Sequence, residues 1–209
     1  KNCPELEDPA VRLALTEYAA FLHLWRNPPG DGDDWIGFTS YRQLAKTPFR
    51  FWSKWQIRWA LWRHDGVGWG FHGVRRHQEG PWRGAAAQAE KEHPGIMAFL
   101  AILAEKFEFE IPERFCTDRF VLFASYWVLP KKLFSAYMDW SWPIVAWCLA
   151  HRNDYDFLRN PLPRQVLDHE RLSSSNQGKN LGYVVERLFI LWYINSNLKI
   201  KRIGPPPRF

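Results

Sequence analysis

The chain is poor in cysteine. Its 209 residues include only Cys3, Cys116 and Cys148, which lie far apart and form no Cys-x-x-Cys pair. This spacing argues against a disulfide framework and a thiolate zinc site, and it favours a reducing compartment, the cytoplasm. No apolar run approaches the ~20 residues that a membrane-spanning helix needs. The chain begins at Lys1 without a signal-like apolar segment, which is compatible with a piece of a longer protein.

Other common signatures are also missing from the sequence. It contains no Gly-x-Ser-x-Gly motif, which argues against one large class of serine hydrolases. It shows no internal repeat and no composition shift that would mark a second domain. Because 209 residues are enough to bury a sizeable core, we expect residues 1–209 to form a single domain.

Tryptophan and positive charge are plentiful. The 13 tryptophans offer flat apolar rings with one donor each, which suit sugars and protein partners as well as cores. The net charge of +6 comes from lysines and arginines that are spread along the chain. This distribution favours an anionic ligand, such as a phosphorylated small molecule, over nucleic acid.

Hydrophobic periodicity and turn residues predict helices that alternate with short strands. The expected helices run from Pro9 to the stop at Asn27-Pro28-Pro29-Gly30, and over 53–63, 85–93, 96–107, 131–140, 143–151 and 178–195. The expected strands are 35–39, 66–71, 120–129 and 198–201, with 120–129 buried at the centre of the sheet and 152–177 a long loop. This alternation predicts an α/β domain with ligands at the carboxyl ends of its strands.

The last helix, 178–195, is the most informative segment. One side is a broad apolar stripe, whereas Tyr183, Glu186 and Arg187 share the other side with Ile190 and Ile194. A freely solvated face would rarely carry two isoleucines, so this side is expected to line a cleft. Since Glu186 and Arg187 are sequential, we expect them to point to different sides and to pair poorly. Glu186 could be a general base or a buried carboxylate that bonds backbone amides.

Several short motifs have both a chemical and a structural interpretation. Asp31-Gly32-Asp33 and Asp154-Tyr155-Asp156 could each hold a divalent cation against a diphosphate, but acidic pairs in turns favour the structural interpretation. The glycines from Gly66 to Gly73 are more typical of a turn or bulge than of a phosphate-binding loop. The spacing of His64, Asp65, His72 and His77 matches no compact metal motif.

Three aromatic or basic positions remain open. Arg42 follows the strand at 35–39, where its forked cation could hold phosphate oxygens or could simply lie on the surface. Trp127 lies inside the expected buried strand, where core packing is the commoner role. Trp140 lies where the helices 131–140 and 143–151 are expected to break, so its ring could face a cleft.

Three sets of segments together resemble capsular-polysaccharide-type glycosyltransferases over roughly residues 10 to 200. The front part is similar in Leu15-Thr16-Glu17-Tyr18, Leu24-Trp25-Arg26-Asn27 and Asp34-Trp35-Ile36-Gly37-Phe38-Thr39-Ser40-Tyr41-Arg42. The middle is similar in Tyr126-Trp127-Val128-Leu129-Pro130, Phe134-Ser135-Ala136-Tyr137-Met138 and Trp140-Ser141-Trp142-Pro143. The end is similar in Gly182-Tyr183-Val184-Val185-Glu186-Arg187-Leu188-Phe189, which contains the Gly-Tyr-x-x-Glu-Arg-Leu pattern of that family.

The resemblance implies a GT-A-like nucleotide-diphospho-sugar transferase fold for polysaccharide biosynthesis. Two positions depart from the family pattern: Ser40 stands where histidine is usual, and residues 1–8 carry no pattern for the family's first strand. The implied activity is transfer of a sugar from a nucleotide-diphospho-sugar to a glycan hydroxyl, with manganese or magnesium as an unassigned cofactor. The implied roles are donor binding by Tyr41, Arg42 and Arg187, base catalysis by Glu186, and sugar binding by Trp127, Trp140 and Tyr183.

Two other classes of function fit the same sequence. A non-catalytic carbohydrate-binding or scaffolding domain would explain the many tryptophans and the missing first strand. A basic nucleic-acid-associated domain is suggested by charge alone.

Overall fold

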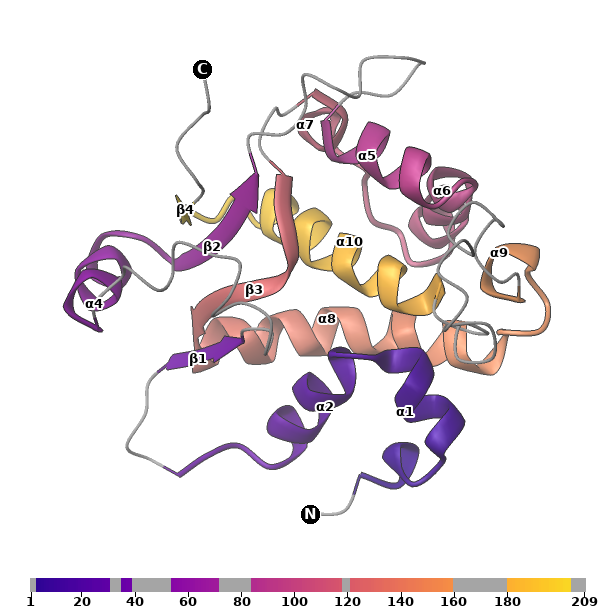
Figure 1. Cartoon of the computed structure of the whole chain (residues 1–209), viewed down its shortest axis with the longest axis horizontal. Helices are drawn as coiled ribbons and strands as arrows, with labels where there is room; N and C mark the ends of the chain where they lie inside the picture. The colour runs from indigo at the N-terminus through magenta and orange to yellow at the C-terminus, as the bar shows by residue number, and fades with distance from the viewer. Residues whose placement is uncertain are drawn as a thin grey trace, which may run out of the picture.

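The computed structural model describes residues 3–30, 35–38, 54–71, 84–117, 121–159 and 180–203. They form a mixed α/β fold that is mostly helical, with one small sheet (Figure 1). The helical elements are η1 (Pro4–Leu6), α1 (Pro9–Leu15), α2 (Tyr18–Arg26), α4 (Lys54–Arg63), α5 (Gly84–Glu92), α6 (Ile96–Lys106), α7 (Glu113–Thr117), α8 (Lys131–Ala150), α9 (Asp156–Arg159) and α10 (Asn180–Asn195). The strands are β1 (Trp35–Phe38), β2 (Gly66–Phe71), β3 (Val121–Pro130) and β4 (Ile200–Ile203). The expected α/β class is therefore confirmed.

The four described strands form a mixed sheet in the order β1-β3-β2-β4. β3 lies between β1 and β2 and is antiparallel to both, so the expectation of a central strand at 120–129 is confirmed. Only β2 and β4 run parallel. The rule that places ligands at the carboxyl ends of strands needs parallel neighbours, so it does not locate a site in this sheet.

α10 is the central helix of the molecule (Figure 1). It contacts α1, α7, α8, α9 and β3. Ile190, Tyr193 and Ile194 on its expected polar side are buried together with the apolar stripe. This side of α10 is therefore not freely solvated, and the cleft that it is expected to line stays a prediction.

An aromatic core joins α10 to the sheet and to α8. Trp127 of β3 is 1% exposed and stacks on Phe189 of α10, with ring centroids 4.8 Å apart. Tyr137 of α8 meets the edges of both rings at 6.1 and 5.3 Å. Offset and edge-on aromatic pairs of this kind add to the stabilisation from buried area. They fix where α10 sits against β3.

The N-terminal helix begins as expected and then divides. The Asp8 carboxylate accepts a hydrogen bond from Ala10 N at 2.8 Å, ahead of Pro9 in the first turn of α1. At Thr16 the backbone adopts φ 51° and ψ −123°, which ends α1 before α2 starts. A β-branched residue at positive φ is strained, so this junction is held by its surroundings.

The expected break between helices 131–140 and 143–151 is wrong. α8 runs without interruption from Lys131 to Ala150, with Pro143 inside it. Ser141, which lies at the expected break, hydrogen-bonds the Tyr18 hydroxyl at 2.8 Å in the interior. Packing against α2 and α10 therefore outweighs the local preference of proline to end a helix.

The glycines of β2 allow close packing of strands. A Cβ on Gly66 would lie 2.6 Å from Leu129 Cδ2 and 3.0 Å from Val128 O. The register with β3 shifts between Gly68 and Gly70, so the expectation of a strand and bulge rather than a phosphate loop is confirmed for the described glycines.

Two further findings concern the whole described chain. Cys3, Cys116 and Cys148 carry free thiols. Within the described ranges, every helix is too short or too polar to cross a bilayer.

Candidate functional site

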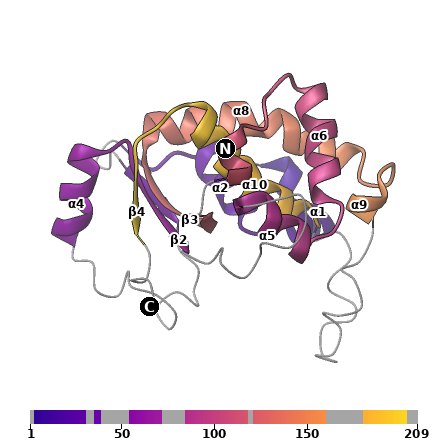
Figure 2. The same ribbon diagram turned by 90° about the horizontal axis from the view of Figure 1, so that it is seen from above.

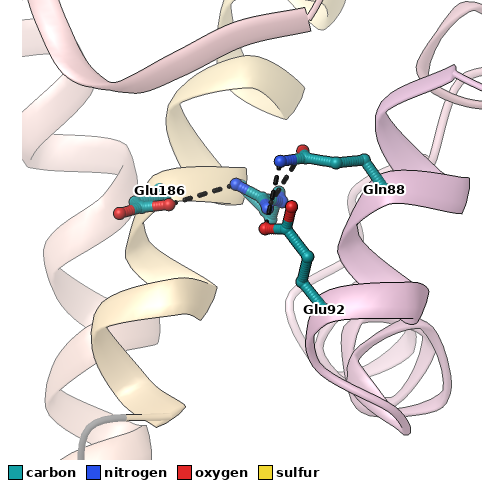
Figure 3. A network of polar contacts seen from close by, with 4 residues as sticks. Gln88, Glu92 and Glu186 are labelled. Atoms are coloured by element: carbon teal, nitrogen blue, oxygen red, sulfur yellow. Dashed lines mark hydrogen bonds and ion pairs between the residues drawn. The ribbon is translucent and has the colours of Figure 1, made fainter. Parts of the chain in front are cut away.

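Arg187 of α10 hydrogen-bonds both Glu186 of the same helix and Gln88 of α5. Figure 3 shows Glu186, Gln88 and Glu92 of this polar network. Arg187 Nη1 donates a hydrogen bond to Glu186 Oε2 at 3.2 Å, and Arg187 Nη2 donates to Gln88 Oε1 at 3.3 Å. Gln88 Nε2 in turn donates to Glu92 Oε2 at 3.1 Å, one turn further along α5. With the neighbouring aromatic pair described below, these residues form what we term the α10 polar cluster: Gln88, Glu92, His93, Tyr183, Glu186 and Arg187.

The contact between Glu186 and Arg187 corrects the expectation that sequential residues would not pair. The guanidinium is on a long side chain, which lets one nitrogen reach back to the neighbouring carboxylate while another reaches α5. Consecutive side chains leave the helix in different directions, but the length of the arginine side chain still allows the contact with Glu186.

The Arg187 side chain is almost completely enclosed, with 2% of its surface exposed. Its Nε is buried and has no hydrogen-bond partner among the described residues. A buried cation is stable only when paired and hydrogen-bonded, so the fold depends on Glu186 and Gln88 to offset this charge.

Glu186 remains partly accessible, with 19% of its side chain exposed. Burial raises the pKa of its carboxyl to about 7, and the negative charges of Glu17 and Glu92 add to that rise. The Arg187 cation opposes the rise but does not cancel it. A carboxyl with a pKa near neutrality can both take up and release a proton at physiological pH.

An aromatic pair lies beside the carboxylate. The rings of His93 and Tyr183 stack with centroids 3.5 Å apart and an interplanar angle of 16°. Burial, and then the Arg187 cation, lower the pKa of His93 to about 4, so the imidazole is neutral at pH 7. Its Nδ1 is buried and has no partner among the described residues. Burial, followed by the charges of Glu186 and Glu92, raises the pKa of the Tyr183 hydroxyl.

The junction of α1 and α2 brings a further acidic group to α10. A Cβ on Gly182 would lie 2.9 Å from Thr16 Oγ1 and 3.1 Å from Thr16 Cγ2, so glycine lets the first turn of α10 approach this strained residue. Glu17 follows directly, and its charge raises the pKa of Glu186. Surrounding protein atoms desolvate Glu17 and raise its own pKa as well. A carboxyl from a distant part of the chain thus raises the pKa of Glu186.

The turn after α5 fixes the position of His93. Glu90 accepts hydrogen bonds from Gly95 N at 2.8 Å and from Met97 N at 3.1 Å, at the start of α6. Gly95 adopts φ 91°, a conformation that glycine takes up readily. This carboxylate cap joins α5 to α6 and holds the end of α5 against α10.

The structure separates the predicted site residues into three groups. Glu186, Arg187 and Tyr183 lie together in the α10 polar cluster. Trp127 is in the aromatic core and has no free ring face for a sugar, while Trp140 is half-buried in α8 and meets the edge of Phe109 at 5.4 Å. Tyr41 and Arg42 lie outside the described residues.

Where the structure describes the short motifs with two interpretations, their side chains make local structural contacts. Asp156 forms an ion pair with Arg159 in the single turn of α9. Asp65 Oδ2 accepts from Lys199 N at 2.7 Å, which ties the start of β2 to the segment before β4. Asp31, Asp33, His72, His77 and Gly73 lie outside the described residues. Among the described residues, no group of three or more His, Cys, Asp and Glu side chains could hold a metal ion.

Sequence reasoning missed the residues that complete the cluster. Gln88, Glu92 and His93 lie on or just after a helix that was expected, and Gln88 and Glu92 have the four-residue spacing of neighbours on one helical face. That spacing is a signal for a local pair only. Nothing in the sequence indicates that this face would meet α10.

Comparison with known proteins found no match: no family model, no curated protein and no solved structure is significantly similar to this chain.

Proposed function

We propose that this chain transfers a sugar from a nucleotide-diphospho-sugar to a glycan hydroxyl, with Glu186 as the base that deprotonates the acceptor. The observation that carries the proposal is a carboxyl that is 19% exposed and hydrogen-bonded by the buried Arg187, in surroundings whose desolvation raises its pKa toward neutrality. The similarity of Gly182–Leu188 to the closing motif of capsular-polysaccharide-type glycosyltransferases supports it independently. That motif coincides with the part of α10 that carries the polar cluster.

In the proposed step, the acceptor O–H proton moves to the ionised Glu186 carboxylate. The acceptor oxygen then forms a bond to the anomeric carbon of the sugar, and the bond from that carbon to the diphosphate oxygen breaks. The nucleoside diphosphate leaves with the electron pair of the broken bond. A base with a pKa near the working pH contributes about 10²- to 10⁴-fold to such a step.

Arg187 acts in this proposal as a positioning residue. Because its side chain is 2% exposed, it orients the Glu186 carboxylate and favours its charged form rather than touching the diphosphate. Contacts to the diphosphate remain assigned to Tyr41 and Arg42 as sequence predictions. Among the described residues, no three His, Cys, Asp or Glu side chains come together as metal ligands, and we assign no step to a metal ion.

The test is nucleoside diphosphate release from a panel of nucleotide sugars with mixed glycan acceptors, compared between wild type, Glu186→Gln and Glu92→Gln. We expect Glu186→Gln to lower turnover by about 10²-fold or more while leaving donor binding intact. Glu92→Gln is the comparison variant: Glu92 lies in the same network, and because its charge helps to raise the pKa of Glu186, removing it should shift the pH profile of turnover toward lower pH without abolishing turnover. Full turnover in Glu186→Gln would remove this residue as the base.

A non-catalytic carbohydrate-binding or scaffolding domain is a second candidate. The near-complete enclosure of Arg187 favours this candidate, because a buried ion pair of this kind can be part of the fold without taking part in catalysis. The two candidates differ in a thermal-shift experiment. A scaffold would gain stability from a glycan and release no nucleotide from any donor, whereas a transferase would also gain stability from its nucleotide sugar.

A further inference from the structure

Three tryptophans on α4 face the solvent. Trp55, Trp59 and Trp62 are 76%, 51% and 78% exposed. Their spacing of four and then three residues places them on one stripe that spans roughly 60° of the helix circumference. Large apolar side chains gathered in this way on a surface mark an interaction site.

The opposite face of α4 is fixed to the protein. Ala60 and Leu61 are 0% and 7% exposed, and the helix packs against β2. The exposed stripe therefore lies on the far side of a helix whose orientation is set by its buried face. In Figures 1 and 2, α4 lies at one end of the molecule, beside β2 and β4 and away from α5, α6 and α9.

Positive charge surrounds the tryptophan stripe. The Arg58 guanidinium lies 5.9 Å from the ring of Trp55, and the Arg63 guanidinium lies 4.6 Å from Trp59 and 5.6 Å from Trp62. At helical spacing, Arg58 flanks the stripe on one side and Arg63 flanks it on the other. From Trp35 to His64 the sequence has no acidic residue and six basic ones: Arg42, Lys46, Arg50, Lys54, Arg58 and Arg63.

We propose that α4 is a membrane-surface anchor that docks in the plane of a bilayer containing anionic lipids, with Trp55, Trp59 and Trp62 at the headgroup–acyl boundary. Indole rings accumulate at this boundary because they are flat, largely apolar and carry one donor. Flanking arginines then meet the lipid phosphates, and each contributes attraction to an anionic surface.

The positions of the arginines favour a bilayer over a single-stranded nucleic acid. Binding of bases requires free ring faces on which they can stack. In α4 each of the three rings has a guanidinium within 6 Å of its centroid, a cation–π arrangement that leaves at most one face of each ring for a base to stack on. At a membrane surface the same arrangement is retained, since the rings enter edgewise while the cations stay at the level of the phosphates.

The experiment is flotation of the full chain with phosphatidylcholine vesicles, with and without phosphatidylglycerol. We expect binding only when phosphatidylglycerol is present, and weaker binding as salt is raised. Replacing all three tryptophans (Trp55→Ala, Trp59→Ala and Trp62→Ala) should lower the partition coefficient by about tenfold or more. Replacing Arg58→Gln and Arg63→Gln together should lower it by about thirtyfold.

Trp35→Ala is the matched control, because Trp35 is an exposed tryptophan, at 36%, that lies on β1 rather than α4. It should bind vesicles as the wild type does. An unchanged circular dichroism melt of the triple variant shows that lost binding is not lost folding. Equal flotation of the triple variant and the wild type would overturn the proposal. The proposal would also be overturned if the chain bound a single-stranded oligonucleotide through these tryptophans and did not bind vesicles.

Discussion

At the scale of single residues, desolvation rather than ion pairing controls Glu186. An arginine nitrogen lies 3.2 Å from its carboxylate, yet burial raises the pKa of the carboxyl to about 7. The neighbouring charges of Glu17 and Glu92 contribute to that rise. The ionised form therefore costs free energy in the folded protein and is available for proton transfer near neutral pH.

This ionisation predicts a pH-dependent stability difference between the wild type and Glu186→Gln. Between the ordinary pKa of 4.5 and the folded value of about 7, the folded state keeps a proton that the unfolded state has released. The wild type should therefore lose stability as pH rises through this window, by up to about 3 kcal/mol, and Glu186→Gln should not. Urea unfolding of both proteins at pH 5 and pH 8 measures the change.

His93 acts in the opposite direction but does not obscure this comparison. Its folded pKa of about 4 lies below the ordinary value of 6.5, so its contribution is present above pH 6.5 and lost as pH falls toward 4. The histidine is present in both proteins and largely cancels in the difference. A wild-type-to-variant gap that stays constant from pH 5 to pH 8 would show that Glu186 titrates normally.

Single residues of the site could be selected from sequence, but their partners could not. Glu186 and Arg187 stood out because they accompany isoleucines on a helix that is otherwise apolar. Gln88 and His93 could not be connected to them, because contacts between distant segments leave no periodic signal in either segment. The directions of consecutive side chains on a helix do not predict the contact between Arg187 and Glu186, because that contact depends on the length of the arginine side chain.

At the scale of elements, the junction of α1 and α2 stores strain next to the polar cluster. Thr16 holds φ 51° and ψ −123°, a region that glycine adopts far more easily than threonine. We expect Thr16→Gly to raise the free energy of unfolding by about 1–2 kcal/mol. Glu7→Gly is the control: Glu7 has φ −70°, so glycine there should lower stability by about 0.5–1 kcal/mol. Equal losses in both variants, measured by thermal unfolding, would show that Thr16 is unstrained.

α8 gives a second prediction at this scale. Pro143 lies inside the helix and has no N–H with which to complete the hydrogen-bond ladder. We expect Pro143→Ala to raise stability by about 1–2 kcal/mol. Ala136→Pro, at an exposed position of the same helix, should lower it by about 3 kcal/mol. If Pro143→Ala instead destabilises the protein in urea unfolding, the proline has a packing role that its exposed position does not reveal.

Elements with strong local patterns were predicted well. The helices at 84–92 and 96–106 and the central strand at 121–130 differ from expectation by about one residue at each end. The failures came where tertiary packing overrode a local signal. Thr16 is not a residue type that signals the end of a helix, whereas Ser141 and Pro143 favour a helix boundary. Nevertheless α1 ends at Thr16, and α8 continues through Pro143.

At the scale of the whole molecule, the arrangement follows from one enclosed helix. α10 is apolar on nearly every side, so α1, α7, α8 and α9 collect around it and β3 packs against it. The sequence predicted the α/β class but not the strand directions. β1 and β3 pair across more than 80 intervening residues, and alternation of helices and strands does not specify direction over such connections.

The central claim is that α10 carries a carboxyl that ionises near neutral pH within the folded protein. Its most direct test is the titration of Glu186 by carbon NMR of glutamate carboxyls, with Glu186→Gln supplying the assignment; no substrate is needed. We predict a midpoint of about 7 for the resonance that disappears in the variant. A midpoint at the ordinary value of 4.5 would contradict the account and remove the basis for assigning Glu186 as the base.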